Sequence, residues 1–396
     1  MRMRKAIAAL VGLLLGGVAV TPAHAETVRS KQWHLDAMKA DDIWKISIGK
    51  GVAVAVIDTG VARIPELDGQ VLPGKDFAPD TIEGDERTDY KGHGTTMAAI
   101  IAGTGKGPGG VESAFGLAPG AKIIPLRVDL NGNGISRNAT LKDAIRYAAD
   151  SDARILNISM IGWPDSEELS GAVKYALEKG KLIFAGVGND AAREIYFPAG
   201  TPGVVGVAAV DADGAATKES EHNASVDMAA PGAGIVTACS GSTGLCNSHG
   251  TSDATALASA SAALLWSAHP TWTNNQVLRV LLNTAGKPVD GVERNDYIGY
   301  GVVRPRVALP TPGDPGPPDV YPLPDLAAAG AAGSPHSGAK ITPSPAPKPQ
   351  AAVSKGDGGG LPWLALGLGA CVLIGGAVTA VVVRRAKGGA HGTSQP

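Results

Sequence analysis

The chain has 396 residues, 44% of them hydrophobic and 18% charged, and a formal net charge of −2. That length allows two or three domains, or one large α/β enzyme. The two ends hold six basic residues and no acidic ones, which leaves 29 basic and 37 acidic residues, a net charge of −8, on the part between them. An acidic domain without a basic run excludes nucleic acid as a partner.

The N-terminus has the pattern of a secretory signal peptide. Met1–Lys5 carries three basic residues, and an apolar run follows over 6–20. Ala23 and Ala25 then place small residues at the −3 and −1 positions of a signal-peptidase site. We therefore expect residues 1–25 to be a signal peptide that is removed after Ala25; an uncleaved anchor is the alternative.

Strand and helix patterns alternate through the middle of the chain. Short, near-continuous apolar runs predict strands covered on both faces of a parallel sheet, at residues 52–57, 122–128, 154–159, 181–188 and 204–210. Helix-like segments separate or follow them, at 94–103, 138–150, 166–180, 255–268 and 274–284. The alternation indicates an α/β domain with a mostly parallel sheet flanked by helices, over residues 46–308. Residues 26–45 form a short N-terminal extension before this domain.

The composition changes in the C-terminal part of the chain. Residues 309–360 contain 12 prolines with many Gly, Ala and Ser, and this composition predicts a disordered, partly polyproline linker. Residues 361–383 carry no charge and are long enough for one transmembrane helix. The basic residues of the tail, 384–396, favour a cytoplasmic C-terminus and argue against the alternative, a lipid-anchor signal. The sequence thus predicts an exported domain held at the outside of the cell membrane by a single helix.

The chain has three cysteines, and two of them are close in sequence. Cys239 and Cys246 flank the segment "SGSTGL", whereas Cys371 lies inside the predicted membrane span. In an exported protein the first two are expected to close a small loop by a disulfide bond. Two separate thiols or a metal site are the alternatives, and the sequence contains no His/Cys cluster with zinc spacing.

Chemically active side chains stand where predicted strands end and predicted helices begin. "VAVAVIDTGV" ends a strand on Asp58, "GHGTT" begins a helix with His93, and "HGTSDATALAS" begins another with Ser252. Such groups collect at the carboxyl edge of a parallel sheet. A serine hydroxyl needs a base to take its proton, and a histidine base needs a carboxylate to orient it. Asn189 in "FAGVGND", just past a strand, supplies an amide to stabilise an oxyanion.

Each of these signals is modest alone, but their order and context resemble the subtilisin-like serine proteases. The segments "AVIDTGV", "GHGTTMAAIIAG", "LNIS", "GVGND", "FPAGTPGVVGVAA", "DMAAPG" and "GTSDAT" match the blocks of that family over residues 48–306. The resemblance implies a three-layer fold with a seven-stranded parallel sheet, and hydrolysis of peptide bonds through an acyl-enzyme. It also implies that Ser252 is the nucleophile, His93 the base, Asp58 the orienting carboxylate and Asn189 the oxyanion donor. The substrate-binding residues that it implies are Ser159, Met160, Ile161, Gly162, Ala185 and Gly186, and it implies no cofactor.

A narrower resemblance is to the mycosins, which are membrane-anchored subtilisin-like proteases associated with type VII secretion systems. It lies in the segments "QWHLDAMKADDIWKISIGKGV" (32–52) and "GYGVVRP" (299–305), the proline-rich linker and the single C-terminal span. This likeness implies a location beside secretion machinery and proteolysis of exported substrates. It also implies that residues 26–45 wrap around the domain rather than inhibit it.

Three features depart from familiar patterns. Asp253 follows the nucleophile where many subtilisins have Met or Phe; it either raises the pKa of His93 or, as we favour, faces away and caps the helix N-terminus. Ile161 stands where the family usually has glycine, on the edge strand that pairs with substrate, and predicts a narrow cleft. The loop over 129–140 imitates a calcium loop, but Thr140 replaces the bidentate Glu, so a turn at the cleft rim explains it better and no metal is expected.

These features predict a membrane-anchored extracellular serine endopeptidase. It is expected to process a few exported substrates of a type VII secretion system, with peptides or proteins as substrates. The alternative is a structural subunit that stabilises the secretion complex and whose proteolytic activity is dispensable.

Overall fold

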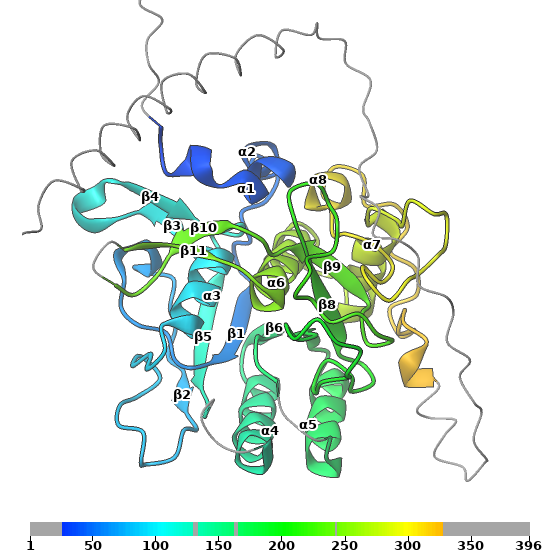
Figure 1. The fold of residues 1–396 in the computed structure, drawn as a ribbon, viewed down its shortest axis with the longest axis horizontal. Coiled ribbons are helices and arrows are strands. Elements are labelled where there is room, and N and C mark those ends of the chain that lie inside the picture. The colour runs from blue at the N-terminus through cyan, green and yellow to red at the C-terminus, as the bar shows by residue number, and fades with distance from the viewer. Residues whose placement is uncertain (1–25, 130–133, 162–164, 242–243, 328–396) are drawn as a thin grey trace, which may run out of the picture. The chain divides into compact units, whose positions relative to one another are not determined.

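The computed structural model describes residues 26–129, 134–161, 165–241 and 244–327. Within them, a seven-stranded sheet forms the centre of the molecule, in the order β2-β5-β1-β6-β7-β8-β9 (Figure 1). Its strands are β1 (Ala53–Asp58), β2 (Lys75–Asp76), β5 (Lys122–Arg127), β6 (Ala153–Ile158), β7 (Leu182–Gly186), β8 (Val205–Val210) and β9 (Met228–Pro231). All neighbouring strands pair in parallel. The predicted parallel α/β sheet is confirmed, and the five predicted strands agree with β1, β5, β6, β7 and β8 to within two residues at each end.

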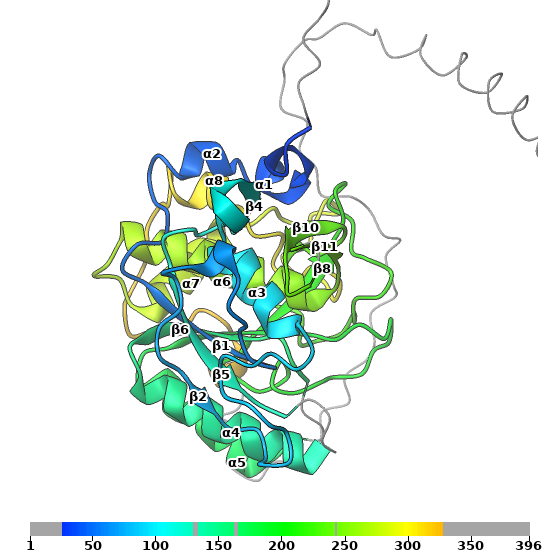
Figure 2. The ribbon, with the colours of Figure 1, turned by 90° about the vertical axis from the view of Figure 1, so that its left-hand side faces the viewer.

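Helices cover both faces of the sheet, because alternate residues of a strand point to opposite sides. Val54 and Val56 of β1 belong to one core, whereas Ala55 and Ile57 belong to the other. The first core contains α3 (His93–Ala102), α6 (Thr251–Ala268) and α7 (Asn274–Thr284), and the second contains α4 (Gly134–Asp150) and α5 (Glu167–Glu178). Figures 1 and 2 show α4 and α5 side by side, on the opposite side of the sheet from α3 and α6. The expected three layers are therefore confirmed.

Two helices show how the local sequence sets their ends. The hydroxyl of Ser166 accepts a hydrogen bond from Leu169 N at the start of α5, and Gly180 follows its end with a φ of 73°. Both signals agree with the prediction. The helix α6 begins at Thr251, four residues before the predicted start, because Gly250 turns the chain with a φ of 120° that L-residues rarely adopt.

The N-terminal extension packs on the domain. It contains η1 (Arg29–Lys31), α1 (Trp33–Ala37) and α2 (Ala40–Ile43), which lie across the end of the molecule remote from α4 and α5 (Figures 1 and 2). The Gln32 amide donates to the carbonyls of Phe115 and Val236, at 2.8 and 3.1 Å. The indole of Trp33 donates to the Ala233 carbonyl at 2.9 Å. These bonds confirm the predicted wrapping of residues 26–45.

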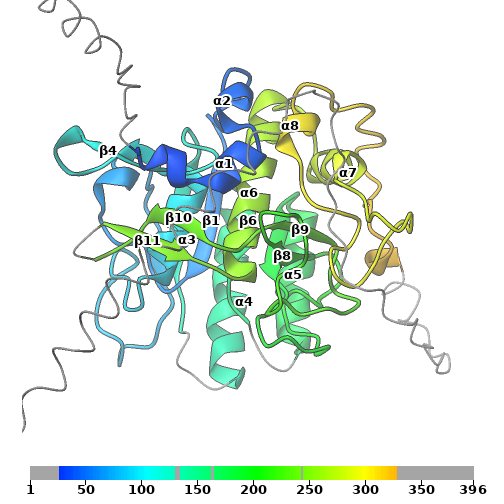
Figure 3. The same cartoon turned by 45° about the horizontal axis from the view of Figure 1, so that its top comes forward.

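Several short elements were not predicted, because runs of three or four residues show too little periodicity. They are η2 (Pro65–Leu67), η3 (Pro108–Gly110), α8 (Pro305–Ala308) and the strands β3 (Thr104–Lys106), β4 (Glu112–Phe115), β10 (Ile235–Ala238) and β11 (Leu245–Ser248). The strands β10 and β11 pair in antiparallel fashion and lie in front of α3 (Figure 3). This hairpin therefore covers the start of the helix that carries His93.

The predicted disulfide bond between Cys239 and Cys246 is not present, and both residues are free cysteines. In the register of the hairpin, Cys246 lies directly opposite Thr237. Cys239 comes two residues after Thr237, so it is a diagonal neighbour of Cys246 and not its direct partner. Diagonal Cα atoms on neighbouring antiparallel strands are about 7–8 Å apart, which exceeds the usual span of a disulfide. Burial and the neighbouring Cys239 thiol raise the pKa of Cys246 to about 12. The two cysteines are therefore neighbours without a covalent bond between them.

The predicted linker differs from the structure over its first part. Leu309 and Leu323 are buried in the core, and the Arg279 guanidinium donates to the carbonyls of Pro315 and Pro317. Proline-rich backbone has no internal hydrogen bonds, so its carbonyls remain available to such a donor. The predicted signal peptide, the rest of the linker, the span 361–383 and the tail lie outside the described residues. Among the residues described, no helix has the length and apolar character needed to cross a membrane.

Candidate active site

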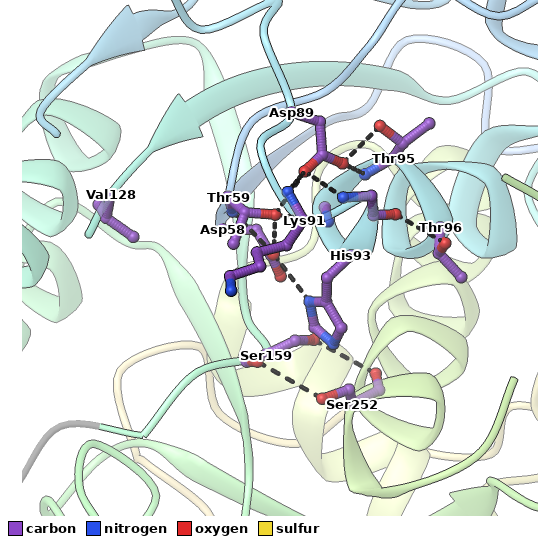
Figure 4. Close-up of polar contacts among 12 residues, drawn as sticks. Asp58, Thr59, Asp89, Lys91, His93, Thr95, Thr96, Val128, Ser159 and Ser252 are labelled. Carbon is purple, nitrogen blue, oxygen red and sulfur yellow. Dashed lines mark hydrogen bonds and ion pairs between the residues drawn. The ribbon is translucent and has the colours of Figure 1, made fainter. Parts of the chain in front are cut away.

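The fold brings the four predicted catalytic side chains to one edge of the sheet. Asp58 is the last residue of β1, and Asn189 follows the end of β7 by three residues. His93 is the first residue of α3, and Ser252 is the second residue of α6. Figure 4 shows His93 between Asp58 and Ser252. This is the carboxyl edge of a parallel sheet, as predicted.

Asp58 fixes the orientation of His93. The Nδ1 atom of His93 lies 2.8 Å from Oδ1 of Asp58, and the Thr59 N–H donates to the same oxygen at 2.8 Å. Asp58 is 1% exposed, whereas the His93 side chain is 33% exposed. Because an ionised carboxylate only accepts hydrogen bonds, the proton of neutral His93 must be on Nδ1. The Nε2 atom is then free to accept a proton.

The charges around His93 favour its protonated form. Burial is the largest single effect and lowers the pKa of His93, whereas the charge of Asp58 and its hydrogen bond raise it. The charges of Asp253 and Asp89 also raise it, and all these effects together bring the pKa to about 9. At neutral pH most molecules therefore carry an imidazolium, and the neutral base accumulates only at alkaline pH.

Ser252 faces His93 but is hydrogen-bonded elsewhere. Its hydroxyl donates to the Ser159 carbonyl at 3.4 Å, and the Ser159 hydroxyl donates to the Ser252 carbonyl at 3.2 Å (Figure 4). Among the described residues, no hydrogen bond joins Ser252 to His93. Catalytic hydrogen bonds often tighten only when substrate binds, so this arrangement does not exclude Ser252 and His93 as a catalytic pair.

Asn189 lies against the turn that precedes Ser252. Its Oδ1 accepts from the Thr251 N–H at 2.9 Å. A methyl group placed on Gly250 would come within 3.1 Å of Nδ2, so a glycine is needed here both for space and for its backbone angle. With its oxygen held in this way, Asn189 presents its amide NH₂ beside the first turn of α6. The Ser252 N–H belongs to the same turn, whose first four N–H groups lack acceptors within the helix. Together these donors can stabilise an oxyanion.

The predicted substrate-binding residues flank this site. Ser159 and Met160 follow β6 and are 8% and 6% exposed, and Ile161 after them is half-buried. Ala185 and Gly186 lie on the neighbouring strand β7. A Cβ atom added to Gly186 would lie only 3.0 Å from the Thr251 hydroxyl oxygen, so the backbone of β7 packs closely against the first turn of α6 here. Gly162 lies outside the described residues. Their contacts with substrate remain a prediction.

One important carboxylate, Asp89, was not predicted from the sequence. Asp89 accepts hydrogen bonds from the hydroxyls of Thr59 and Thr95 at 2.7 and 2.6 Å, and from the N–H groups of Gly92 and Thr95 at 2.7 and 2.8 Å (Figure 4). It thereby ties the residue after Asp58 to the first turn of α3. The signal was present in "DYKGHGTT", because an aspartate shortly before a helix commonly accepts from its unpaired N–H groups.

The structure bears out the favoured interpretation of Asp253 only in part. Asp253 is 0% exposed and lies in the first turn of α6, where a negative charge is favourable, but its side chain does not cap the helix, because α6 has no side-chain cap at its N-terminus. The Ser248 hydroxyl donates to its Oδ2 at 3.0 Å. Burial raises the pKa of Asp253 to about 6, although the Ser248 hydrogen bond and the charge of His93 act against that shift. Among the described residues, no group of three His, Cys, Asp or Glu side chains could hold a metal ion.

Comparisons with known proteins agree with this geometry. The thermophilic serine proteinase of Bacillus sp. (strain AK1) is 34% identical over 263 residues, which cover 66% of this chain and 62% of that protein; this chain thus spans less than two thirds of that relative's length. Among solved structures, the MycP3 protease from the type VII (ESX-3) secretion system is 31% identical with a TM-score of 0.62, covering 70% of this chain and 87% of that one. A chain of the periplasmic assembly from the ESX-5 inner membrane complex is 26% identical with a TM-score of 0.64, and the match covers 80% of this chain and 90% of that one.

A sequence model for one protein family matches residues 49–301, which is more than half of the chain and includes all four residues of the candidate site. The chain therefore belongs to the subtilase family, peptidase family S8.

Proposed function

We propose that this protein is a serine endopeptidase that hydrolyses peptide bonds through an acyl-enzyme. The observation that carries the proposal is the buried Asp58, 2.8 Å from His93 Nδ1, on a ring that faces Ser252. In the first step Ser252 Oγ attacks the substrate carbonyl while His93 takes its proton. The negative oxygen that forms is stabilised by the Asn189 amide and the Ser252 N–H. His93 then gives the proton to the leaving amine, and water releases the acyl group by the reverse sequence.

Substitutions of Asn189 test whether its amide stabilises the oxyanion. Asn189→Ala is expected to lower turnover by about 10²–10³-fold, a magnitude measured in a subtilisin, because the forming charge loses a donor. The matched variant Asn189→Asp keeps an acceptor for the Thr251 N–H but has no amide donor, so it should lose at least as much. Steady-state cleavage of a peptide substrate measures both. A near-normal Asn189→Asp enzyme would instead mean that Asn189 only anchors Thr251.

Substitutions of Ile161 test whether its side chain narrows the substrate-binding cleft. The sequence prediction of a narrow cleft rests on this branched side chain at the end of the Ser159–Ile161 segment. Ile161→Gly is expected to raise kcat/KM several-fold on an unselected peptide mixture, because the side chain no longer crowds the strand that pairs with substrate. Ile161→Leu, which keeps the volume, is the matched control. An Ile161→Gly enzyme without any gain would contradict the narrow-cleft interpretation.

We further propose that the protease acts outside the cell membrane, held by a C-terminal helix over residues 361–383, and processes a few exported proteins. The proposed signal peptide and the uncharged C-terminal stretch support this location. The likeness to MycP3 of the type VII (ESX-3) system supports a link to that kind of secretion. A freely released, degradative protease would need neither a tether nor a narrow cleft.

A structural role in a secretion complex is the second candidate. It is favoured by the likeness to a chain of the periplasmic assembly from the ESX-5 inner membrane complex. The two roles can coexist in one protein. A pure scaffold, however, has no need of the Asp58–His93 pair beside Ser252 and Asn189.

One experiment separates these roles. The termini of the exported proteins are compared between the parent strain, a strain with Ser252→Ala and a strain without the chain. A processing protease predicts altered termini of a few proteins in the Ser252→Ala strain. Secretion that survives Ser252→Ala with unchanged termini, but fails without the chain, would instead assign a scaffold role.

A further inference from the structure

Asp89 is the common acceptor of a hydrogen-bond network beside the candidate site. Its carboxylate oxygens accept from the hydroxyls of Thr59 and Thr95 at 2.7 and 2.6 Å (Figure 4). They also accept from the N–H groups of Lys91, Gly92 and Thr95 at 3.1, 2.7 and 2.8 Å. So many donors suit an ionised carboxylate, which only accepts hydrogen bonds. The proposed reaction steps do not themselves use this group.

The Asp89 carboxylate fixes the direction of both hydroxyl groups. The single hydrogen of each hydroxyl points to Asp89, so the lone pairs of its oxygen are left for backbone donors. The Thr59 hydroxyl accepts from the Gly94 N–H of α3 at 3.1 Å, and the Thr95 hydroxyl accepts from the Ala62 N–H at 2.9 Å. These two crossed bonds fasten the segment that follows β1 to the first turn of α3.

The two fastened segments approach each other closely. A Cβ atom added to Gly94 would lie 2.2 Å from the Gly60 carbonyl oxygen and 3.0 Å from Cβ of Asp58. Gly94 directly follows His93, so the separation of the two segments sets where the imidazole lies relative to Asp58. A shift of α3 against β1 would therefore change the 2.8 Å distance between His93 Nδ1 and Asp58 Oδ1.

Thr59 also has a second acceptor within reach. Its hydroxyl oxygen lies 3.2 Å from Asp58 Oδ1, which is the oxygen paired with His93 Nδ1. The distance to Asp89 Oδ1 is shorter, at 2.7 Å, and a hydroxyl has only one hydrogen to give. Asp89 thus keeps the Thr59 hydroxyl from competing with His93 for Asp58.

We propose that Asp89 is a positioning residue of the protease, which holds α3 against the end of β1 and reserves Asp58 for His93. It acts through Thr59 and touches neither the substrate nor the reacting atoms. The inference rests on the proposed function, because its effect on catalysis passes through the base of that reaction. Its effect on the Asp58–His93 pair is measurable without turnover.

The first test is steady-state cleavage of a fluorogenic peptide by the full chain with Asp89→Asn. Asparagine keeps the shape of the side chain but offers one acceptor oxygen in place of two, so the Thr59 hydroxyl is free to turn to Asp58. We expect kcat to fall by about ten- to a hundred-fold, as small misplacements of catalytic groups produce, with little change in KM. An unchanged kcat would overturn the inference.

A double-mutant cycle tests whether Asp89 acts through Thr59. Thr59→Val removes the hydroxyl at nearly constant volume and should lower kcat, whereas Thr59→Ser keeps the hydroxyl and should stay near the parent. In the double variant Asp89→Asn, Thr59→Val the competing hydroxyl is gone, so the loss should be smaller than the product of the two single losses. A loss equal to that product would contradict a route through Thr59.

Asp85→Asn is the matched control. Asp85 precedes Asp89 by four residues in the same loop and accepts from the Arg87 N–H and the Thr88 hydroxyl at 3.0 and 2.9 Å. Its substitution makes the same change of net charge and loosens the loop without removing a bond to α3, so kcat should stay near that of the parent. Thermal melts monitored by circular dichroism establish that each variant is folded.

The second test observes the Asp58–His93 pair directly. Proton NMR of the full chain with Ser252→Ala detects the hydrogen on His93 Nδ1, which resonates far downfield when it is strongly bound to a carboxylate. Labelled histidine and its loss in His93→Ala identify the signal. Addition of Asp89→Asn should move it upfield, because the Thr59 hydroxyl then competes for Asp58, and an unmoved signal would overturn the inference.

The two tests separate failure of this inference from failure of the proposed function. A parent protein that cleaves no peptide, but whose His93 signal still moves upfield with Asp89→Asn, would overturn the proposed function and leave the positioning of His93 by Asp89 intact. An active parent whose kcat and His93 signal are both unchanged by Asp89→Asn would overturn only the role of Asp89.

Discussion

Replacement of Ser252 by alanine is expected to abolish peptide hydrolysis. The structure offers Ser252 Oγ as the nucleophile that faces His93, at the N-terminal turn of α6. Without that oxygen no acyl-enzyme can form, and the expected loss is about 10⁶-fold in kcat, a magnitude measured in a subtilisin. The measurement is steady-state cleavage of a fluorogenic peptide at alkaline pH, where His93 is neutral.

A neighbouring serine provides the control for this prediction. Ser259 is buried on the same helix, and its hydroxyl donates to Asn157 at 3.0 Å. Ser259→Ala should keep most of the activity, even if it costs some stability. Cleavage that persists in Ser252→Ala would place the nucleophile on another residue.

Replacement of Asp58 by asparagine is expected to lower kcat by about 10⁴-fold. Asparagine has nearly the same shape, so the packing at the end of β1 should survive. Its amide can donate to Nδ1 of His93, which favours the tautomer with the proton on Nε2, and that tautomer cannot take the serine proton. The loss of charge also lowers the pKa of His93, since Asp58 is the main group that raises it.

The pH profile separates these effects from misfolding. Asp58→Asn should lose activity at every pH and should not recover as the pH rises. Asp76, which pairs with the buried Arg127 at 2.6 Å, gives a carboxylate control for stability, because Asp76→Asn weakens a fold contact without removing a member of the relay. An Asp58→Asn enzyme within ten-fold of the parent would contradict the orienting role.

The sequence predicted those parts of the site that depend on local pattern. Asp58 and Asn189 could be placed because each follows an apolar run that reads as a buried strand. His93 and Ser252 could be placed because each stands in a glycine-containing segment at the start of a helix, although α6 begins earlier than its apolar pattern suggested. The number of strands in the sheet followed from the resemblance and not from any of these residues.

The missed features depend on contacts between segments that are remote in sequence. The burial of Asp253 requires the β10–β11 hairpin, whose short strands carry little periodicity. The first part of the proline-rich segment packs because Arg279 donates to its carbonyls, and composition alone indicates a free linker there. The expected disulfide failed for a similar reason, since the spacing of Cys239 and Cys246 does not reveal the diagonal register.

The most direct test of the account is the site of covalent modification by a fluorophosphonate in the full chain at alkaline pH. We expect one adduct, on Ser252, that is located by mass spectrometry of peptides and is lost in His93→Ala. An unmodified Ser252, or an adduct on another serine that forms equally well without His93, would contradict the claim that Asp58, His93, Ser252 and Asn189 form one hydrolytic site.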